Sequence, residues 1–178
     1  MQFTNEKKAF SGDKESLEAK SDDEKEINNL VDKYMKAYFE NDASAILNMQ
    51  PEEVIHLMGT YISWMFEDPE EYFREMGEDM AYNWEELQES LGDAVYTITY
   101  EISDYIDMPK EEIADYQSGY SMYTMLDDEL DELNMEITEA KMVVIDLYVN
   151  YDDTNAEVGK LTPTFIKVDG EWYLGIDQ

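Results

Sequence analysis

The residue best suited to proton transfer in this sequence is its single histidine, His56. An unperturbed imidazole titrates at about pH 6.5, so it can act as an acid or a base near neutral pH. His56 stands between Ile55 and Leu57 in a segment with helical spacing, and no serine or cysteine nucleophile motif accompanies it. We expect a histidine at the surface or paired in the core, with a catalytic base as the alternative.

A carboxylate inside an apolar run is the second candidate for acid–base chemistry. Asp146 interrupts the apolar segment 143–149. In a strand, Val144, Asp146 and Tyr148 share one face while the core lies on the other. We interpret Asp146 as a carboxylate on an exposed sheet face, because buried carboxylates are rare unless they are paired. The alternatives are an acid that lines a pocket and a structural hydrogen bond.

Oxygen ligands that suit a metal occur at every second position of one segment, at Asp153, Asn155 and Glu157. Calcium prefers oxygen donors, but the glycine and the final glutamate of an EF-hand loop are missing. We interpret this segment as a solvated turn, and the acidic run 127–132 as a solvated helix face. The chain has no cysteine, one histidine and no glycine-rich phosphate loop, so we predict neither a metal nor a cofactor.

Aromatic and methionine side chains supply candidate binding residues. Tyr61, Trp64 and Phe66 do not fit one helical face, so we expect at least one of them to be exposed or to line a groove. Trp84 and the methionines before it recur at helical spacing, which favours core positions, with an adaptable binding surface as the alternative. The candidate ligand-binding residues are Tyr61, Trp64, Trp84 and Tyr100.

Four helices are predicted before residue 92, and they carry His56, Tyr61, Trp64 and Trp84. Ser21 and Glu24 have the spacing of a capping box, which marks a helix start. Asp68-Pro69 suits the start of the longest helix, and Gly92 suits its end. The predicted helical ranges are 21–41, 43–49, 51–65 and 68–91, with a further helix at 110–133.

The period then changes from helical to alternating. Residues 96–102 alternate apolar and polar side chains, and further strands are predicted at 137–151, 158–168 and 172–176, with a hairpin turn at Asp169-Gly170. Short turns favour antiparallel pairing, so the predicted class is α+β, with N-terminal helices packed on a mainly antiparallel C-terminal sheet. Residues 1–20 show neither period and are interpreted as a flexible leader or tether, and residues 21–178 as a single domain.

The order of these elements, together with three local motifs, resembles the cystatin-like fold of nuclear transport factor 2 and ketosteroid isomerase. The motifs are an aromatic first helix that ends in an acidic turn (Tyr34 to Asp42), the strand Tyr96–Tyr100 and the closing hairpin Asp169–Tyr173. Over about residues 22–178 the chain is similar to uncharacterised domains of Gram-positive bacterial lipoproteins. The resemblance implies a curved sheet, a pocket between helices and sheet, and an exported, lipid-anchored protein whose leader and anchoring cysteine precede Met1.

Composition restricts the class of partner, because 12 basic residues against 44 acidic ones give a net charge of −32. The basic surface that nucleic acid or an anionic membrane requires is absent, and no apolar run is long enough to span a bilayer. Our leading interpretation is a non-catalytic cell-surface or secreted module that binds a small molecule or a protein. The alternatives are an isomerase or dehydratase with an Asp/Tyr/His pocket, and a cytoplasmic protein that binds a basic partner. Homodimerisation through the open sheet face is a further hypothesis.

Overall fold

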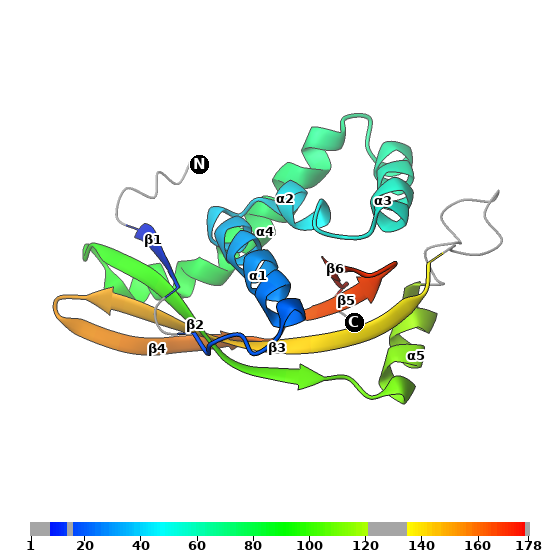
Figure 1. Cartoon of the computed structure of the whole chain (residues 1–178). Coiled ribbons are helices and arrows are strands. Elements are labelled where there is room, and N and C mark those ends of the chain that lie inside the picture. Colours follow the sequence, from blue (N-terminus) through cyan, green and yellow to red (C-terminus); the bar gives the residue numbers. More distant parts are fainter. Residues whose placement is uncertain (1–7, 14–15, 121–134, 177–178) are drawn as a thin grey trace.

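The computed structural model describes residues 8–13, 16–120 and 135–176. Within these ranges the chain folds into five helices and one six-stranded sheet, which confirms the predicted α+β class. Helices α1 to α4 lie on one side of the sheet, and α5 lies beside the start of the long strand β3 (Figure 1). The helices are α1 (Asp22–Glu40), α2 (Ala43–Leu47), α3 (Glu52–Met65), α4 (Pro69–Leu91) and α5 (Lys110–Tyr120).

The helix ends follow from local hydrogen bonding. Ser21 Oγ accepts the N–H of Glu24 at 3.1 Å to start α1, which ends at Asn41 in the left-handed conformation. Asp68 caps α4 by accepting the N–H of Glu70 at 3.0 Å, and Gly92 ends that helix with a positive φ of 58°. The four predicted helices before the first long strand are thus confirmed. Helix α5 matches the start of the predicted helix 110–133, whose later part lies outside the described residues.

The sheet is curved and is built around one long strand. Its order is β1-β2-β3-β5-β6, and β4 also pairs with β3, so that β4 and β5 share one edge of β3. All pairings are antiparallel except that of β1 with β2, which confirms the mainly antiparallel prediction. Asp169 and Gly170 both have positive φ, as the predicted tight hairpin requires. The bounds are β1 (Lys8–Asp13), β2 (Tyr96–Asp107), β3 (Ile137–Tyr151), β4 (Thr154–Leu161), β5 (Thr164–Val168) and β6 (Glu171–Leu174).

Strand β1 differs from the prediction that residues 1–20 form a flexible leader. It adds to the sheet edge parallel to β2, with Phe10 opposite Ile98. The Phe10 ring lies 5.2 Å from the ring of Phe39 and 6.1 Å from that of Tyr100, measured between ring centroids. A short edge strand held by backbone hydrogen bonds and a single aromatic anchor produces no hydrophobic period, which explains why the pattern did not predict it.

The core consists of two clusters of buried apolar side chains. In the larger, Ile27, Val31 and Met35 of α1 and Trp84 of α4 pack on the apolar face of β2 and β3. The alternating residues of the predicted strand, which are Tyr96, Ile98, Tyr100 and Ile102, are all buried there. The smaller cluster packs α5 against β5 and the start of β3 and α3. The interface between the first helix and the sheet is therefore filled by large side chains.

Candidate functional site

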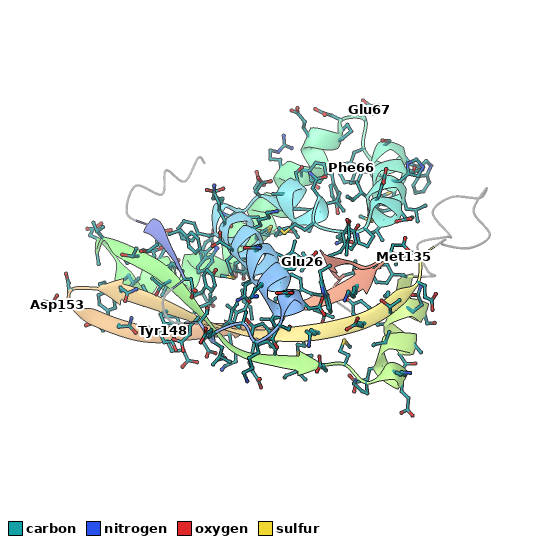
Figure 2. All side chains as sticks on the ribbon, viewed as in Figure 1. Glu26, Phe66, Glu67, Met135, Tyr148 and Asp153 are labelled. Carbon is teal, nitrogen blue, oxygen red and sulfur yellow. The ribbon has the colours of Figure 1, made fainter. Side chains whose placement is uncertain are left out.

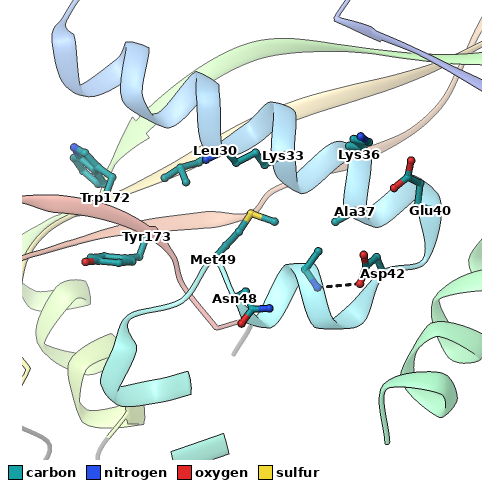
Figure 3. Close-up of a pocket in the computed structure, with 11 residues that line it drawn as sticks. Leu30, Lys33, Lys36, Ala37, Glu40, Asp42, Asn48, Met49, Trp172 and Tyr173 are labelled. Atoms are coloured by element: carbon teal, nitrogen blue, oxygen red, sulfur yellow. Dashed lines mark hydrogen bonds between the residues drawn. The ribbon is translucent and has the colours of Figure 1, made fainter. Parts of the chain in front are cut away.

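A surface cavity of about 610 Å³ lies between α1, α2 and β6 (Figure 3). Its lining combines apolar and aromatic side chains with cations and carboxylates from three elements. The lining residues are Leu30, Lys33, Lys36, Ala37, Glu40, Asp42, Ala45, Asn48, Met49, Trp172 and Tyr173. Six of these eleven residues are apolar or aromatic and four are charged, so the lining offers both apolar contact and charged groups to a small molecule.

Helix geometry places the α1 side chains on one wall. Leu30, Lys33 and Ala37 follow at steps of three and four, so they lie on one face of the helix. The opposite wall is fixed at both of its ends. Asp42 Oδ1 accepts the N–H of Ala45 at 3.0 Å and starts α2, and the carbonyl of Met49 accepts the N–H of Leu174 at 2.9 Å. The second bond ties the segment after α2 to strand β6.

The aromatic end of the cavity is held by a polar network. Trp172 donates its indole N–H to Asp23 Oδ1 at 2.9 Å, and Lys167 Nζ donates to the same oxygen at 3.0 Å. These two hydrogen bonds, that of Trp172 first, hold the pKa of Asp23 below its usual value. Lys167 Nζ also lies 5.5 Å from the centre of the Trp172 ring. The start of α1 and the last hairpin are thereby fixed to each other.

Two lysines on the α1 wall are exposed to solvent. Lys33 and Lys36 form no ion pair within the part of the chain that the structure describes. The cations that do pair with carboxylates are Lys25, Arg74, Lys141, Lys160 and Lys167. The two lysines are three residues apart on one face of the helix, so rotation of their long side chains can bring both ammonium groups to one anionic group.

The residues predicted for acid–base chemistry are not brought together. His56 is exposed on α3, where its backbone carbonyl accepts the hydroxyl of Thr60 at 3.2 Å. Tyr100 is buried on the core face of β2 and donates its hydroxyl to Asp32 Oδ1 at 3.2 Å. Burial first, and then the negative charge of Asp32, raise the pKa of Tyr100.

The prediction that Asp146 is an exposed carboxylate is wrong. As predicted, it lies on the face of β3 opposite Ile145 and Leu147, yet it is only 7% exposed. Lys160, its cross-strand neighbour on β4, forms an ion pair with it. Hydrogen bonds from Lys160 and Ser103 lower the pKa of Asp146 against the opposing effect of burial. The pairing supports the alternative in which Asp146 forms a structural hydrogen bond, because a cationic partner offsets the free-energy cost of burying the carboxylate.

The predicted ligand-binding aromatics occupy three different environments, none of them on the cavity wall. Trp64 is 79% exposed at the end of α3, with its ring centroid 6.5 Å from that of Tyr61. This exposure confirms the prediction for the 61–66 segment. Trp84 is 6% exposed in the larger core cluster, edge-on to the ring of Tyr38 at 5.5 Å. Tyr100 is the buried residue described above.

The described residues contain no group of three or more His, Cys, Asp or Glu side chains placed to hold a metal ion. Asp153 is in the turn before β4, and Asn155 and Glu157 lie two residues apart on that strand, so the side chains of these two residues point to the same face of the sheet. Asn155 Nδ2 instead donates to Asn150 Oδ1 at 2.5 Å. The acidic run 127–132 lies outside the described residues.

The cavity residues themselves were not predicted from the sequence. The available signal was the helical spacing of Leu30, Lys33 and Ala37, together with the scarcity of cations in the chain. No local pattern joins α1 to Trp172, because the contact between them spans more than 140 residues.

Comparison of the chain with protein-family models, with curated proteins and with solved structures finds no match. Among the described residues, no helix has both the length and the apolar character needed to cross a membrane.

Proposed function

We propose that this protein is a non-catalytic binding domain of cystatin-like fold, displayed at the cell surface or secreted, whose cavity between α1, α2 and β6 takes a small organic anion. The observation that carries this proposal is the pair Lys33 and Lys36. Both ammonium groups are unpaired in the described part of the chain, and both border a cavity with an apolar floor.

The ligand chemistry follows from the lining of the cavity. An acidic group, such as a carboxylate or sulfonate, sits against the two lysines and is held by charge-assisted hydrogen bonds. An apolar or aromatic body covers Met49 and the Trp172 side of the cavity. Glu40 and Asp42, at the end of the cavity opposite Trp172 and beside Lys36 (Figure 3), favour a hydrogen-bond donor on the ligand. Because the whole chain repels anions at a distance, binding depends on these two local cations.

Two observations support binding in preference to catalysis. Tyr100 and Asp146 lie on opposite faces of the sheet and His56 is on α3, so these three residues do not face a common space, and the bond between Tyr100 and Asp32 is packed against the core. The space beneath α1, where a pocket of the isomerase type would lie, is occupied by Ile27, Val31 and the strand residues that pack on them. A buried, packed interface leaves no room for a substrate.

The fold and the location are part of the proposal. The curved sheet with helices on one side and the closing hairpin at Asp169 support the resemblance to cystatin-like domains of bacterial lipoproteins. A lipobox cysteine and leader encoded ahead of Met1 in the natural gene would agree with display at the cell surface. An upstream sequence without an export signal would favour the cytoplasmic alternative.

The binding test uses two fluorescent probes that share an aromatic body and differ in charge. These are 8-anilinonaphthalene-1-sulfonate, an anion, and N-phenyl-1-naphthylamine, which is neutral. We expect the anion to bind more tightly, and the double variant Lys33→Ala/Lys36→Ala to weaken anion binding about tenfold or more, as expected for the loss of two charge-assisted contacts. Binding of the neutral probe should change little.

Lys110→Ala is the matched control, because Lys110 is an exposed cation outside the cavity lining. It should leave the binding of both probes unchanged. If the lysine pair can be removed without loss of anion binding, or if both probes bind equally well to the native protein, the proposed site is wrong.

A further inference from the structure

A second apolar depression lies on the other side of the helical layer, between α2, α3 and α4. We call it the Met groove; it has a volume of about 180 Å³. Three of its nine lining residues are methionines, and methionine side chains adapt their shape to different partners. The lining residues are Ala43, Ile46, Leu47, Gln50, Met58, Tyr72, Phe73, Met76 and Met80.

Beyond Met58, the end of α3 carries exposed apolar side chains. Met58, Tyr61 and Met65 follow one another at helical spacing from the groove to the last turn of that helix. Trp64 and Met65 are 79% and 50% exposed there. The chain turns at Phe66 and Glu67, which lie at the end of the helical layer farthest from the sheet (Figure 2). A cluster of exposed large apolar side chains of this kind marks an interaction surface.

Unpaired carboxylates border the groove. Glu75 and Asp79 come three residues after Tyr72 and Met76 on α4, so they neighbour the groove-lining residues on the helix surface. Both carboxylates are exposed, and neither forms an ion pair with another described residue. Segment 67–90 as a whole carries ten acidic residues against Arg74 alone. An apolar groove with an acidic border is complementary to a ligand that is apolar on one face and basic on the other.

We propose that the Met groove and the exposed end of α3 form a docking surface for a basic amphipathic α-helix of a partner protein. One large apolar side chain of that helix enters the groove, since an apolar cavity of about 150 Å³ has room for a benzene ring. Neighbouring apolar side chains of the partner cover Trp64 and Met65, and its lysines or arginines face Glu75 and Asp79. Helices that lay an apolar face into a hydrophobic groove are a recurrent mode of recognition.

The test uses three dye-labelled peptides with roughly 18 residues each, which is about five helical turns. The first is built from leucine and lysine at amphipathic helical spacing. The second replaces every lysine by glutamate, and the third keeps the composition of the first in an order without amphipathic spacing. Fluorescence anisotropy should show saturable binding of the first peptide, binding at least about tenfold weaker for the third, and none for the second.

Variants of the protein locate the binding surface. Trp64→Ala and Met76→Gln should each weaken binding of the amphipathic basic peptide about tenfold, as for contacts central to an interface. Glu75→Gln/Asp79→Asn should weaken binding and also reduce its sensitivity to salt between about 0.05 M and 0.5 M. Tyr82→Ala removes another exposed aromatic side chain, on α4 but outside the groove lining, and should have no effect. Circular dichroism confirms that each variant is folded.

Several results would overturn the proposal. Equal binding of the ordered and the scrambled basic peptides would show attraction to net charge alone. Binding that survives both Trp64→Ala and Met76→Gln would place the site elsewhere. No saturable binding up to millimolar concentration would remove a peptide as the occupant. If no peptide binds but the protein forms dimers in sedimentation that Trp64→Ala abolishes, the surface binds a second copy instead. If no peptide binds but the protein adsorbs to phosphatidylcholine vesicles and Trp64→Ala abolishes the adsorption, the surface binds lipid instead.

Discussion

Trp172 and Asp23 are joined by a hydrogen bond of 2.9 Å, although they are 149 residues apart in the sequence. The bond connects strand β6, the last in the chain, to the first turn of helix α1. Trp172 and α1 are also adjacent walls of the cavity to which we assign ligand binding. The shape of the cavity therefore depends on a contact between the two ends of the domain.

Loss of this contact should loosen the aromatic end of the cavity. We expect Trp172→Phe, which keeps a ring but removes the donor, to lower the free energy of unfolding by about 1–2 kcal/mol in urea denaturation, because the acceptor is charged. Tyr173→Phe removes the hydroxyl of the neighbouring residue, which bonds only to the exposed Glu171, and should cost less than about 0.5 kcal/mol. Equal effects of the two substitutions would contradict the structural role of the Asp23 contact.

Two glycines in neighbouring helices should respond oppositely to alanine. A Cβ at Gly77 of α4 would lie 2.7 Å from the carbonyl oxygen of Asn41, whereas a Cβ at Gly59 of α3 would meet nothing within 4 Å. Gly77→Ala must therefore push α4 away from the end of α1, and we expect a loss of about 1–3 kcal/mol in the free energy of unfolding. Gly59→Ala should gain about 0.5–1 kcal/mol from helix propensity. Thermal unfolding of both variants checks the signs, and stabilisation by Gly77→Ala would show that the two segments are farther apart.

Sequence patterns predicted the local elements well and the distant contacts poorly. The helix starts at Ser21 and Asp68 and the turn at Asp169 were predicted because a few adjacent residues determine them. Strand β1 was missed because its pairing partner, β2, begins more than 80 residues later. The burial of Asp146 was missed for the same reason, since the cation that permits it is on another strand. Candidate sites are the hardest to predict from the sequence, because a cavity is built from several segments that are distant in the chain.

The Asp146–Lys160 ion pair gives a pH-dependent contribution to stability. The pKa of Asp146 is lower in the folded protein than its ordinary value, so its contribution is present above about pH 4 and is lost as the pH falls through the folded value. We expect Asp146→Asn to lower the free energy of unfolding by about 1 kcal/mol at pH 7, since Lys160 is half exposed, and by less at about pH 2. Urea denaturation of both proteins across this range measures the difference.

A second ion pair serves as the control for this prediction. Asp107 pairs with Lys141 between β2 and β3, but the Asp107 side chain is 79% exposed. Asp107→Asn should therefore change the free energy of unfolding by less than about 0.5 kcal/mol at either pH. If the difference in free energy of unfolding between the native protein and Asp146→Asn is the same in acid as at pH 7, packing and not the charge is responsible for it.

Two buried tyrosines of β2 should differ in what their hydroxyl groups contribute. The Tyr96 hydroxyl is buried and has no hydrogen-bond partner among the described residues, whereas that of Tyr100 donates to Asp32 at 3.2 Å. Tyr96→Phe removes an unsatisfied polar group and should leave the free energy of unfolding unchanged or raise it by up to about 1 kcal/mol. Tyr100→Phe should lower it by about 0.5–1.5 kcal/mol. Urea denaturation of the two variants side by side is the measurement, and the reverse order would refute these hydrogen-bond assignments.

The claim that the cavity between α1, α2 and β6 binds an organic anion is tested most directly by locating a bound one. A crystal soaked with 6-bromonaphthalene-2-sulfonate reveals the bromine by its anomalous scattering. We expect the bromine beside Met49 and Trp172, with the sulfonate oxygens about 2.7–2.9 Å from Nζ of Lys33 and Lys36. Bromine in the Met groove or on the outer sheet face, with no ligand density beside Lys33 and Lys36, would contradict the proposal.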